Sequence, residues 1–160
     1  MNILLIEPYF TGSHKKWALG FQQASKETIE ILSLEGRYWK WRMHGGAVTL
    51  ARRFLSEKKQ PDLLLATDML DLSTFLALTR ISTAKIPAAL YFHENQLTYP
   101  WSPDDRDVRR QRDYHYGFIN FSSALAADRC FFNTAYHRDS FLEALHPFLK
   151  NFPDYNDLDG

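Results

Sequence analysis

Residues 88–96 read AALYFHENQ, and this stretch decides the fold class of the 160-residue chain. The five apolar or aromatic residues from Ala88 to Phe92 are typical of a strand that is buried on both faces. Four polar residues, His93 to Gln96, follow without a break. In open α/β sheets, ligands bind where loops leave the carboxyl ends of the strands, so these four residues are the first candidates for a site. The alternative is a strand-to-helix turn whose polar side chains bond the nearby backbone.

The rest of the chain alternates between strand-like and helix-like segments. Three further apolar segments have the length of buried strands, at residues 2–6, 63–66 and 129–132, and residues 28–34 alternate between apolar and polar side chains as a strand does. Helices are expected between and after them, at residues 14–24, 45–58, 71–79, 113–127 and 134–148. Ser13 is the expected N-cap of the first helix, and Gly45-Gly46 is the expected start of the second. The pattern predicts an α/β fold with a doubly wound, Rossmann-like parallel sheet of about five strands, in the order 3-2-1-4-5.

This strand order places the topological switch between the first and fourth strands. The loop from Thr11 to His14 and the residues His93 to Gln96 then become neighbours across one crevice. Thr11-Gly12-Ser13-His14 lies at a helix start, where free N–H groups favour an anion or a hydroxyl ligand. A capped helix with a tight turn explains the same residues equally well. The chain has neither G-x-G-x-x-G nor G-x-x-x-x-G-K-[ST], which disfavours a dinucleotide cofactor and a nucleoside triphosphatase.

Residues 37–42, RYWKWR, interleave three cations with three aromatic rings directly after the second predicted strand. A nucleobase or a sugar can stack on such rings while the cations hold phosphate. The competing interpretation is that the rings cover core and the cations stay solvated. Because the segment follows a strand of the parallel sheet, we expect it at the same carboxyl edge as the other two loops.

Residues 104–113 contain four arginines and four aspartates, a balance typical of a solvated helix or loop, although a mobile lid is an alternative. Tyr116, near the start of the following helix, is expected to border the crevice. No pair of His, Asp or Glu residues has a convincing ligand spacing, so no metal site is expected.

The composition is that of a soluble globular domain, with 45% hydrophobic and 24% charged residues. The formal net charge is zero, so a polyanionic partner has no global electrostatic support and would need local patches. Cys130 is the one cysteine, and its apolar context predicts a core position in a reducing compartment. No apolar run reaches the length of a membrane span, and the start lacks a signal peptide, so the expected location is cytoplasmic.

Several motifs together resemble one family. They are Gly12-Ser13-His14-Lys15, Lys40-Trp41-Arg42, Tyr91 to Leu97 with Tyr99-Pro100, Tyr116-Gly117, Phe132-Asn133 and Ser140-Phe141. This set resembles the tRNA-queuosine α-mannosyltransferases, glycosyltransferase-like proteins with the GT-B fold, over nearly the whole chain. The resemblance implies an N-terminal, acceptor-side domain at 1–150. It also implies a linker at 151–160 toward a C-terminal donor-binding domain that the chain does not contain.

The resemblance also implies a reaction: transfer of mannose from GDP-mannose to queuosine in tRNA, with retention at the anomeric carbon and without a metal or other cofactor. His93 and Glu94 would be catalytic, with the histidine against the donor sugar. The residues expected to bind substrate are Gly12, Ser13, His14, Trp39, Lys40, Arg42, Asn95, Gln96 and Tyr116. The sugar nucleotide would need the second domain, so the isolated chain is expected to be inactive. Neither the residues nor the resemblance predict an oligomeric state.

Two other functions are compatible with these residues. One is a GT-B transferase with a lipid-linked or other sugar acceptor, for which a basic amphipathic face is expected; the sequence has none that is strong. The other is a non-catalytic Rossmann-like module, which would bind its ligand without a second domain.

Overall fold

The structure, a computed structural model, describes residues 1–110 and 114–155. These residues form one five-stranded parallel sheet with strands β1 (Asn2–Phe10), β2 (Thr28–Glu35), β3 (Leu63–Thr67), β4 (Ala88–Phe92) and β5 (Arg129–Phe132). The helices are α1 (Gly12–Ala24), α2 (Trp39–Ser56), α3 (Leu72–Thr83), α4 (Arg106–Arg109), α5 (Tyr114–Ala126), α6 (Ala135–Leu149) and the 3-10 helix η1 (Pro153–Tyr155). The predicted α/β class with a parallel Rossmann-like sheet is confirmed.

The strands lie in the order β2-β1-β3-β4-β5, so the predicted order 3-2-1-4-5 is wrong. β1 is flanked on both sides, because Leu5 lies opposite Ile31 of β2 and opposite Leu65 of β3. The topological switch therefore lies between β1 and β3. The alternation of strands and helices is compatible with both orders. The two orders differ in the side of the first strand on which later strands are added to the sheet. The periodicity of the sequence does not reveal that side.

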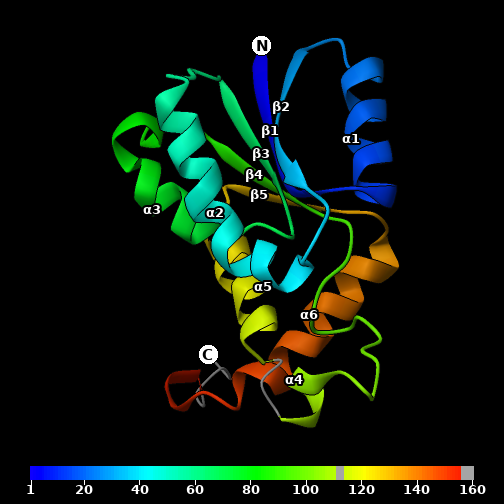
Figure 1. Ribbon diagram of the computed structural model, residues 1–160. Helices are drawn as coiled ribbons and strands as arrows, with labels where there is room; N and C mark the ends of the chain where they lie inside the picture. The colour runs from blue at the N-terminus through cyan, green and yellow to red at the C-terminus, as the bar shows by residue number, and fades with distance from the viewer. Residues whose placement is uncertain (111–113, 156–160) are drawn as a thin grey trace.

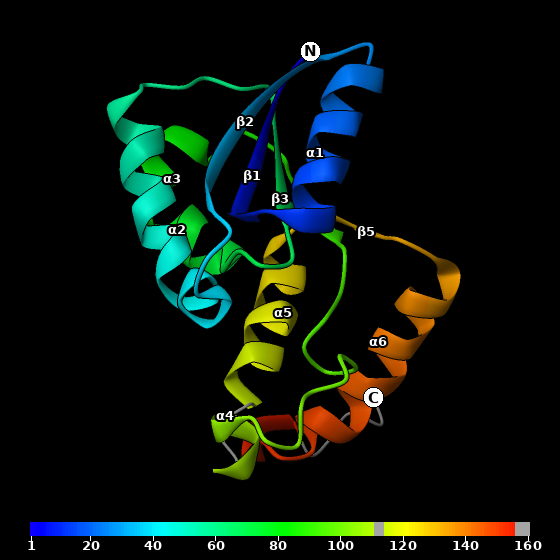
Figure 2. The same ribbon diagram turned by 45° about the vertical axis from the view of Figure 1, so that its right-hand side comes forward.

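The helices cover both faces of the sheet (Figure 1). α1 covers one face, while α2 and α3 cover the other. The two faces of β1 follow its alternation: Ile3 and Leu5 pack with Ala18 of α1, and Leu4 and Ile6 pack toward the other side. Figure 2 shows that the segment leaving β4 runs between α5 and α6 toward α4. The carboxyl ends of the strands therefore open onto this segment.

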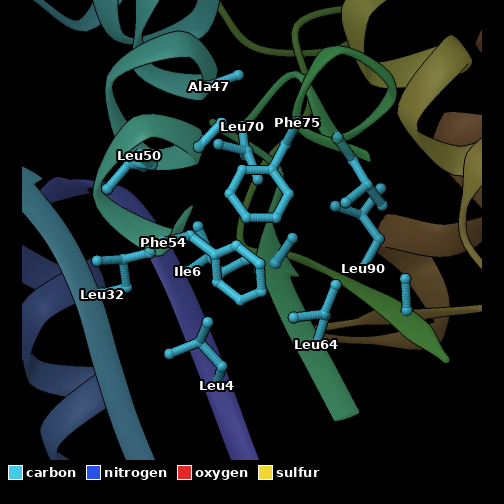
Figure 3. Close-up of a cluster of buried hydrophobic side chains, with 14 of the residues drawn as sticks. Leu4, Ile6, Leu32, Ala47, Leu50, Phe54, Leu64, Leu70, Phe75 and Leu90 are labelled. Carbon is cyan, nitrogen blue, oxygen red and sulfur yellow. The ribbon is translucent and has the colours of Figure 1, made fainter. Parts of the chain in front are cut away.

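The larger core lies between the sheet and helices α2 and α3 (Figure 3). Phe54 and Phe75 meet edge to face there, with ring centroids 5.7 Å apart, and both are fully buried. Leu4, Ile6 and Leu64 contribute from the strands. Burial of these apolar side chains contributes favourably to folding on this side of the sheet.

Two local predictions are wrong. α2 begins at Trp39, not at Gly45-Gly46, so most of the aromatic and cationic segment belongs to its first turn. The two glycines lie inside the helix, where Gly46 approaches Pro8, so they serve close packing and not a helix start. The N-cap of α1 is Thr11, without a side-chain cap bond, and Ser13 lies inside the helix.

The edge strand β5 also differs from expectation. Cys130 is exposed, because β5 pairs with β4 on one side only and its residues 129–131 are open to solvent. Residue 113, the predicted start of a helix, and residues 156–160 of the predicted linker lie outside the described residues. No helix in the described ranges is both long and apolar enough to span a membrane.

Candidate active site at the carboxyl edge of the sheet

Two histidines from distant loops meet at the carboxyl edge of the sheet. His14, in the first turn of α1, and His93, directly after β4, have ring centroids 4.3 Å apart. Glu7 of β1 is fully buried beside both: its Oε2 lies 3.0 Å from His14 Nδ1 and 3.9 Å from His93 Nε2. The predicted convergence of the two loops is therefore confirmed, although β3 separates β1 from β4 in the sheet.

Glu7 uses both of its carboxylate oxygens within this cluster. Oε1 accepts the backbone N–H of Tyr9 at 2.8 Å, and Oε2 lies at hydrogen-bond distance from His14 Nδ1. The register between β1 and β2 shifts between Glu7 and Phe10. Such an irregularity bends a strand locally. A buried carboxylate is tolerated when it has such partners. Glu7 thus holds the ring of His14 in place.

The two histidines have opposite protonation preferences. Burial alone would lower the pKa of His14, but the hydrogen bond and charge of Glu7, with smaller contributions from Asp68 and Glu94, raise it. For His93, burial, with smaller contributions from His14 and His137, lowers the pKa to about 3. The pair therefore consists of a histidine that favours the imidazolium and one that is neutral at physiological pH.

Asp68, directly after β3, is a member of the cluster that sequence reasoning missed. Its Oδ1 accepts the backbone N–H of His93 at 2.8 Å, and its carbonyl accepts from Asn120 Nδ2 of α5 at 2.9 Å. Burial raises the pKa of Asp68 to about 8, against the charge of His14 and the N–H of His93. The signal was available, because Thr67-Asp68 ends an apolar run just as His93 does. The wrong strand order hid its place beside the switch.

Three buried atoms around this cluster have no hydrogen-bond partner within the described part of the chain: Asp68 Oδ2, His93 Nε2 and Gln96 Oε1. Buried polar atoms are nearly always bonded, and an unmet one costs about 1–3 kcal/mol. Their concentration in one place makes this edge the candidate site.

The segment after His93 is held by its own side chains, as the turn alternative proposed. Asn95 Oδ1 accepts from the backbone N–H groups of Leu97 at 3.1 Å and Thr98 at 2.9 Å, and its Nδ2 donates to Thr98 Oγ1. The backbone N–H of Gln96 donates to Asn120 Oδ1 at 2.7 Å. Asn95 thus shapes the turn, and its role as a substrate ligand stays a prediction.

A hollow of about 400 Å³ lies between α1, the start of α2 and the segment after β4. We call it the aromatic hollow, because its lining includes Tyr9, Trp39, Tyr99 and Trp101. Six of the predicted site residues line it: Gly12, Ser13, His14, Trp39, Glu94 and Gln96. Gly12 has a φ of +52°, a conformation that glycine adopts readily and other residues rarely do. Burial raises the pKa of Glu94, with opposing contributions from His14 and Gln96.

Three other predicted substrate ligands, Lys40, Arg42 and Tyr116, do not line the aromatic hollow. Lys40 Nζ lies 2.6 Å from both Asp105 and Asp107, so it ties α2 to α4. Tyr116 is buried, donates its hydroxyl to Asp107 and packs against the ring of Trp39 at 5.2 Å. The residues Asp105 and Asp107 of the balanced charge run are therefore not merely solvated. Arg42 donates from Nε to the carbonyl of Glu35 at the end of β2.

A second hollow of about 620 Å³ lies on the other side of the segment, against α6. We call it the α6 hollow. Its lining includes His93, Glu94 and Asn95 from the segment, and Tyr136, His137, Ser140 and Glu143 from α6. Glu94 lines both hollows. The two histidines thus face different spaces: His14 lines the aromatic hollow, and His93 lines the α6 hollow.

One group of three among the described residues has the spacing of a metal site: Glu7, His14 and His93, whose candidate ligand atoms lie within 4.8 Å of one another. The sequence predicted no metal site, whereas this group is a geometric candidate for one. Histidine binds metals as the neutral imidazole, whereas Glu7 raises the pKa of His14. A metal would therefore compete with the proton on His14.

Comparison with known proteins shows the family of the chain. Residues 2–159 match the family described as tRNA-queuosine alpha-mannosyltransferase N-terminal. The chain is also 37% identical over 156 residues to a tRNA-queuosine alpha-mannosyltransferase from Drosophila melanogaster. That alignment covers 96% of this chain but only 39% of the length of the relative. The chain belongs to the family of tRNA-queuosine alpha-mannosyltransferase N-terminal domains.

Proposed function

We propose that this domain forms one wall of the active site of a retaining mannosyltransferase that acts on queuosine in tRNA, with GDP-mannose as the donor. The name of the relative supports mannose as the sugar and queuosine in tRNA as the acceptor. The observation that carries the proposal is the contact between His14 and His93 over buried Glu7, beside two hollows. The chain spans 39% of the length of the relative, and this supports our proposal that the activity needs a further, donor-binding domain in a GT-B arrangement.

His93 is the proposed contact to the sugar that is transferred. Its pKa of about 3 keeps the imidazole neutral, so it acts as a hydrogen-bond partner of a sugar hydroxyl and not as a cation. Its Nε2 lacks a partner within the described residues. Asp68 holds the backbone of His93, and His14 and Trp17 pack against its ring, so the ring is fixed before the substrate arrives.

The start of α1 is the proposed neighbour of the donor phosphates. Gly12 and Ser13 line the aromatic hollow at the N-terminus of a 13-residue helix, where the backbone N–H groups and the helix dipole favour an anion. His14, whose pKa is raised, adds positive charge at the same end. These features support the leaving group, which gains negative charge as the sugar departs.

The proposed reaction replaces one bond at the mannose C1 atom with another. The bond from C1 to the phosphate oxygen breaks, a bond from C1 to an acceptor hydroxyl oxygen forms on the same face, and the hydroxyl proton passes to the departing phosphate. Glu94 is the proposed group that orients the acceptor hydroxyl, and its position in the lining of both hollows supports this role. Lys40 and Tyr116 hold the wall behind Trp39, and Arg42 is a candidate contact to the RNA backbone.

Transfer of radiolabelled mannose from GDP-mannose tests the proposal. The protein that carries this domain and its C-terminal domain should label tRNA that contains queuosine and should not label the same tRNA with guanosine at that position. Equal labelling of both would point to another acceptor. The 160-residue chain by itself should transfer no label, and efficient transfer by it would contradict the need for a second domain. A cytoplasmic location follows from the proposed acceptor.

A further inference from the structure

We infer that the aromatic hollow selects the acceptor by the positively charged amine of its modified base. The inference rests on the proposed function and names the chemical group that this domain recognises. It is carried by three features of the hollow: aromatic walls, an excess of carboxylates, and a buried acceptor atom that lacks a donor.

The walls of the aromatic hollow suit a flat ring or an organic cation. The rings of Trp39 and Trp101 lie 5.2 Å apart between centroids, and Tyr116 packs against Trp101 at 5.5 Å from outside. Tyr9 and Tyr99 complete the aromatic lining. Aromatic faces attract nucleobases by stacking and alkylammonium groups through their negative electrostatic potential. A volume of about 400 Å³ lies in the range of small-ligand sites.

On the side away from the start of α1, the charges of the aromatic hollow favour a cation. Glu94 and Asp105 line it, whereas none of its lining residues, all of which are described, is a lysine or an arginine. Lys40, whose Nζ lies 5.6 Å from the ring centroid of Trp39 and 5.5 Å from that of Trp101, is shared between Asp105 and Asp107, which leaves these three side chains with one negative charge in excess. The wall opposite the start of α1 is therefore acidic.

Gln96 supplies the hydrogen-bond acceptor. Its relative exposure is 6%, and its Oε1 has no partner within the described residues. Its Nε2 donates to Glu94 Oε1 at 3.4 Å, and its backbone N–H donates to Asn120, so the side chain is held in this orientation. A buried acceptor without a donor costs free energy that a ligand N–H recovers.

Queuosine has the group that this arrangement requires. It is a 7-deazaguanosine whose ring carries an aminomethyl substituent ending in a cyclopentenediol, and the secondary amine is protonated at neutral pH. That amine offers two N–H donors and a positive charge, which match Gln96 Oε1 and the Glu94 carboxylate. Guanosine has no such amine. Because Glu94 lines both hollows, the attached diol would lie at the boundary where sugar transfer is proposed.

A matched pair of nucleosides isolates the charge. 7-Aminomethyl-7-deazaguanosine carries an ammonium group, whereas 7-cyano-7-deazaguanosine has a neutral nitrile at the same position. Binding of each to the protein that carries this domain is followed by tryptophan fluorescence and by calorimetry. We expect the aminomethyl nucleoside to bind about ten-fold more tightly or better, and the difference to shrink at high salt. Equal affinity of the two nucleosides would overturn the inference.

Two variants assign the preference to residues. Gln96→Met removes the acceptor with little change of shape, and Glu94→Gln removes the charge but keeps hydrogen bonding. Each should reduce the preference for the aminomethyl nucleoside to about three-fold or less. Gln23→Leu, an exposed position at the far end of α1, is the matched control and should leave the preference unchanged. An unchanged preference in both test variants would contradict the assignment to these residues.

These measurements separate the inference from the proposed function. Mannose transfer to queuosine-containing tRNA with equal binding of the two nucleosides would leave the proposed function intact and overturn the inference. A clear preference for the aminomethyl nucleoside without any mannose transfer would support the inference and contradict the proposed function. The comparison on the unmodified protein does not depend on the folding of any variant.

Discussion

The face of the sheet under α2 and α3 and the carboxyl edge of the same sheet differ in what their buried atoms do. Under the helices, Leu4, Phe54 and Phe75 are buried among other apolar side chains. At the edge, Glu7 and Asp68 are equally buried but polar. Three of the buried polar atoms at the edge lack a hydrogen-bond partner within the described residues.

This difference separates the part of the molecule that stabilises the fold from the part that serves a ligand. Apolar burial lowers the free energy of the folded state in proportion to the area removed from water. Buried polar groups without partners raise it. The carboxyl edge therefore contains buried polar groups that lower the stability of the fold. Burial of apolar side chains on the face under α2 and α3 offsets this loss.

Phe75→Ala should have the largest effect, and it should act on stability. Removal of a fully buried phenylalanine leaves a cavity beside Phe54 and should lower the free energy of unfolding by about 3–5 kcal/mol. Urea denaturation of the chain measures it. Ile81→Ala, at a residue with 92% relative exposure, is the control and should change stability by about 0.5 kcal/mol or less. Similar losses in both variants would remove the contrast between core and surface.

His93→Ala should act on catalysis, in the full protein. Loss of the proposed contact to the donor sugar should lower kcat by about 100-fold, while the Kd for tRNA stays within about three-fold. His146→Ala, at an exposed position of α6, should change neither quantity. Equal losses in kcat and in tRNA affinity would argue against a catalytic role for His93.

Asp68→Asn should change the pH dependence of stability. Asp68 has a folded pKa of about 8, above the value near 4 of an unfolded aspartate, so the folded state binds more protons between these values. The stabilisation that comes from this extra proton binding is present at low pH and is lost as pH rises toward 8. His93, with a folded pKa of about 3, acts in the opposite sense only below about pH 6.5.

The clean window for this test is therefore pH 6.5 to 8. Across this range the free energy of unfolding of the wild-type chain should fall by on the order of 1 kcal/mol relative to that of Asp68→Asn. The change in unfolding midpoint across the pH series measures this difference. His14, whose pKa is raised, contributes a loss of the same sign to both proteins. Parallel pH curves for the two proteins would show that Asp68 is ionised throughout.

Removal of metal should have the smallest effect. Dialysis of the full protein against EDTA should leave mannose transfer within about two-fold, because Glu7 raises the pKa of His14 and a metal would have to displace the proton that this histidine holds. Addition of Zn²⁺ or Mn²⁺ should then not raise the rate. Loss of activity with EDTA that is restored by one of these ions would instead assign a metal to Glu7, His14 and His93.

The sequence predicted most of the elements and the place where the two loops meet. Runs of four or five mostly apolar residues indicated four of the strands, because strands buried on both faces need them, and the alternation of residues 28–34 indicated β2. It did not predict the strand order, and it therefore missed Asp68. It placed the start of α2 at Gly45, since glycine pairs often mark helix ends, whereas here Gly46 permits close packing against Pro8.

The sequence by itself determined the fold class, the polar residues at the ends of β1 and β4, and the family. Local periodicity and motif residues encode these features within short stretches of chain. Only the tertiary structure decided that β3 lies between β1 and β4, that Asp68 holds the backbone of His93, and that Lys40 bonds two aspartates 65 and 67 residues away. Such contacts depend on which elements pack together and bury one another, and no local pattern records that choice.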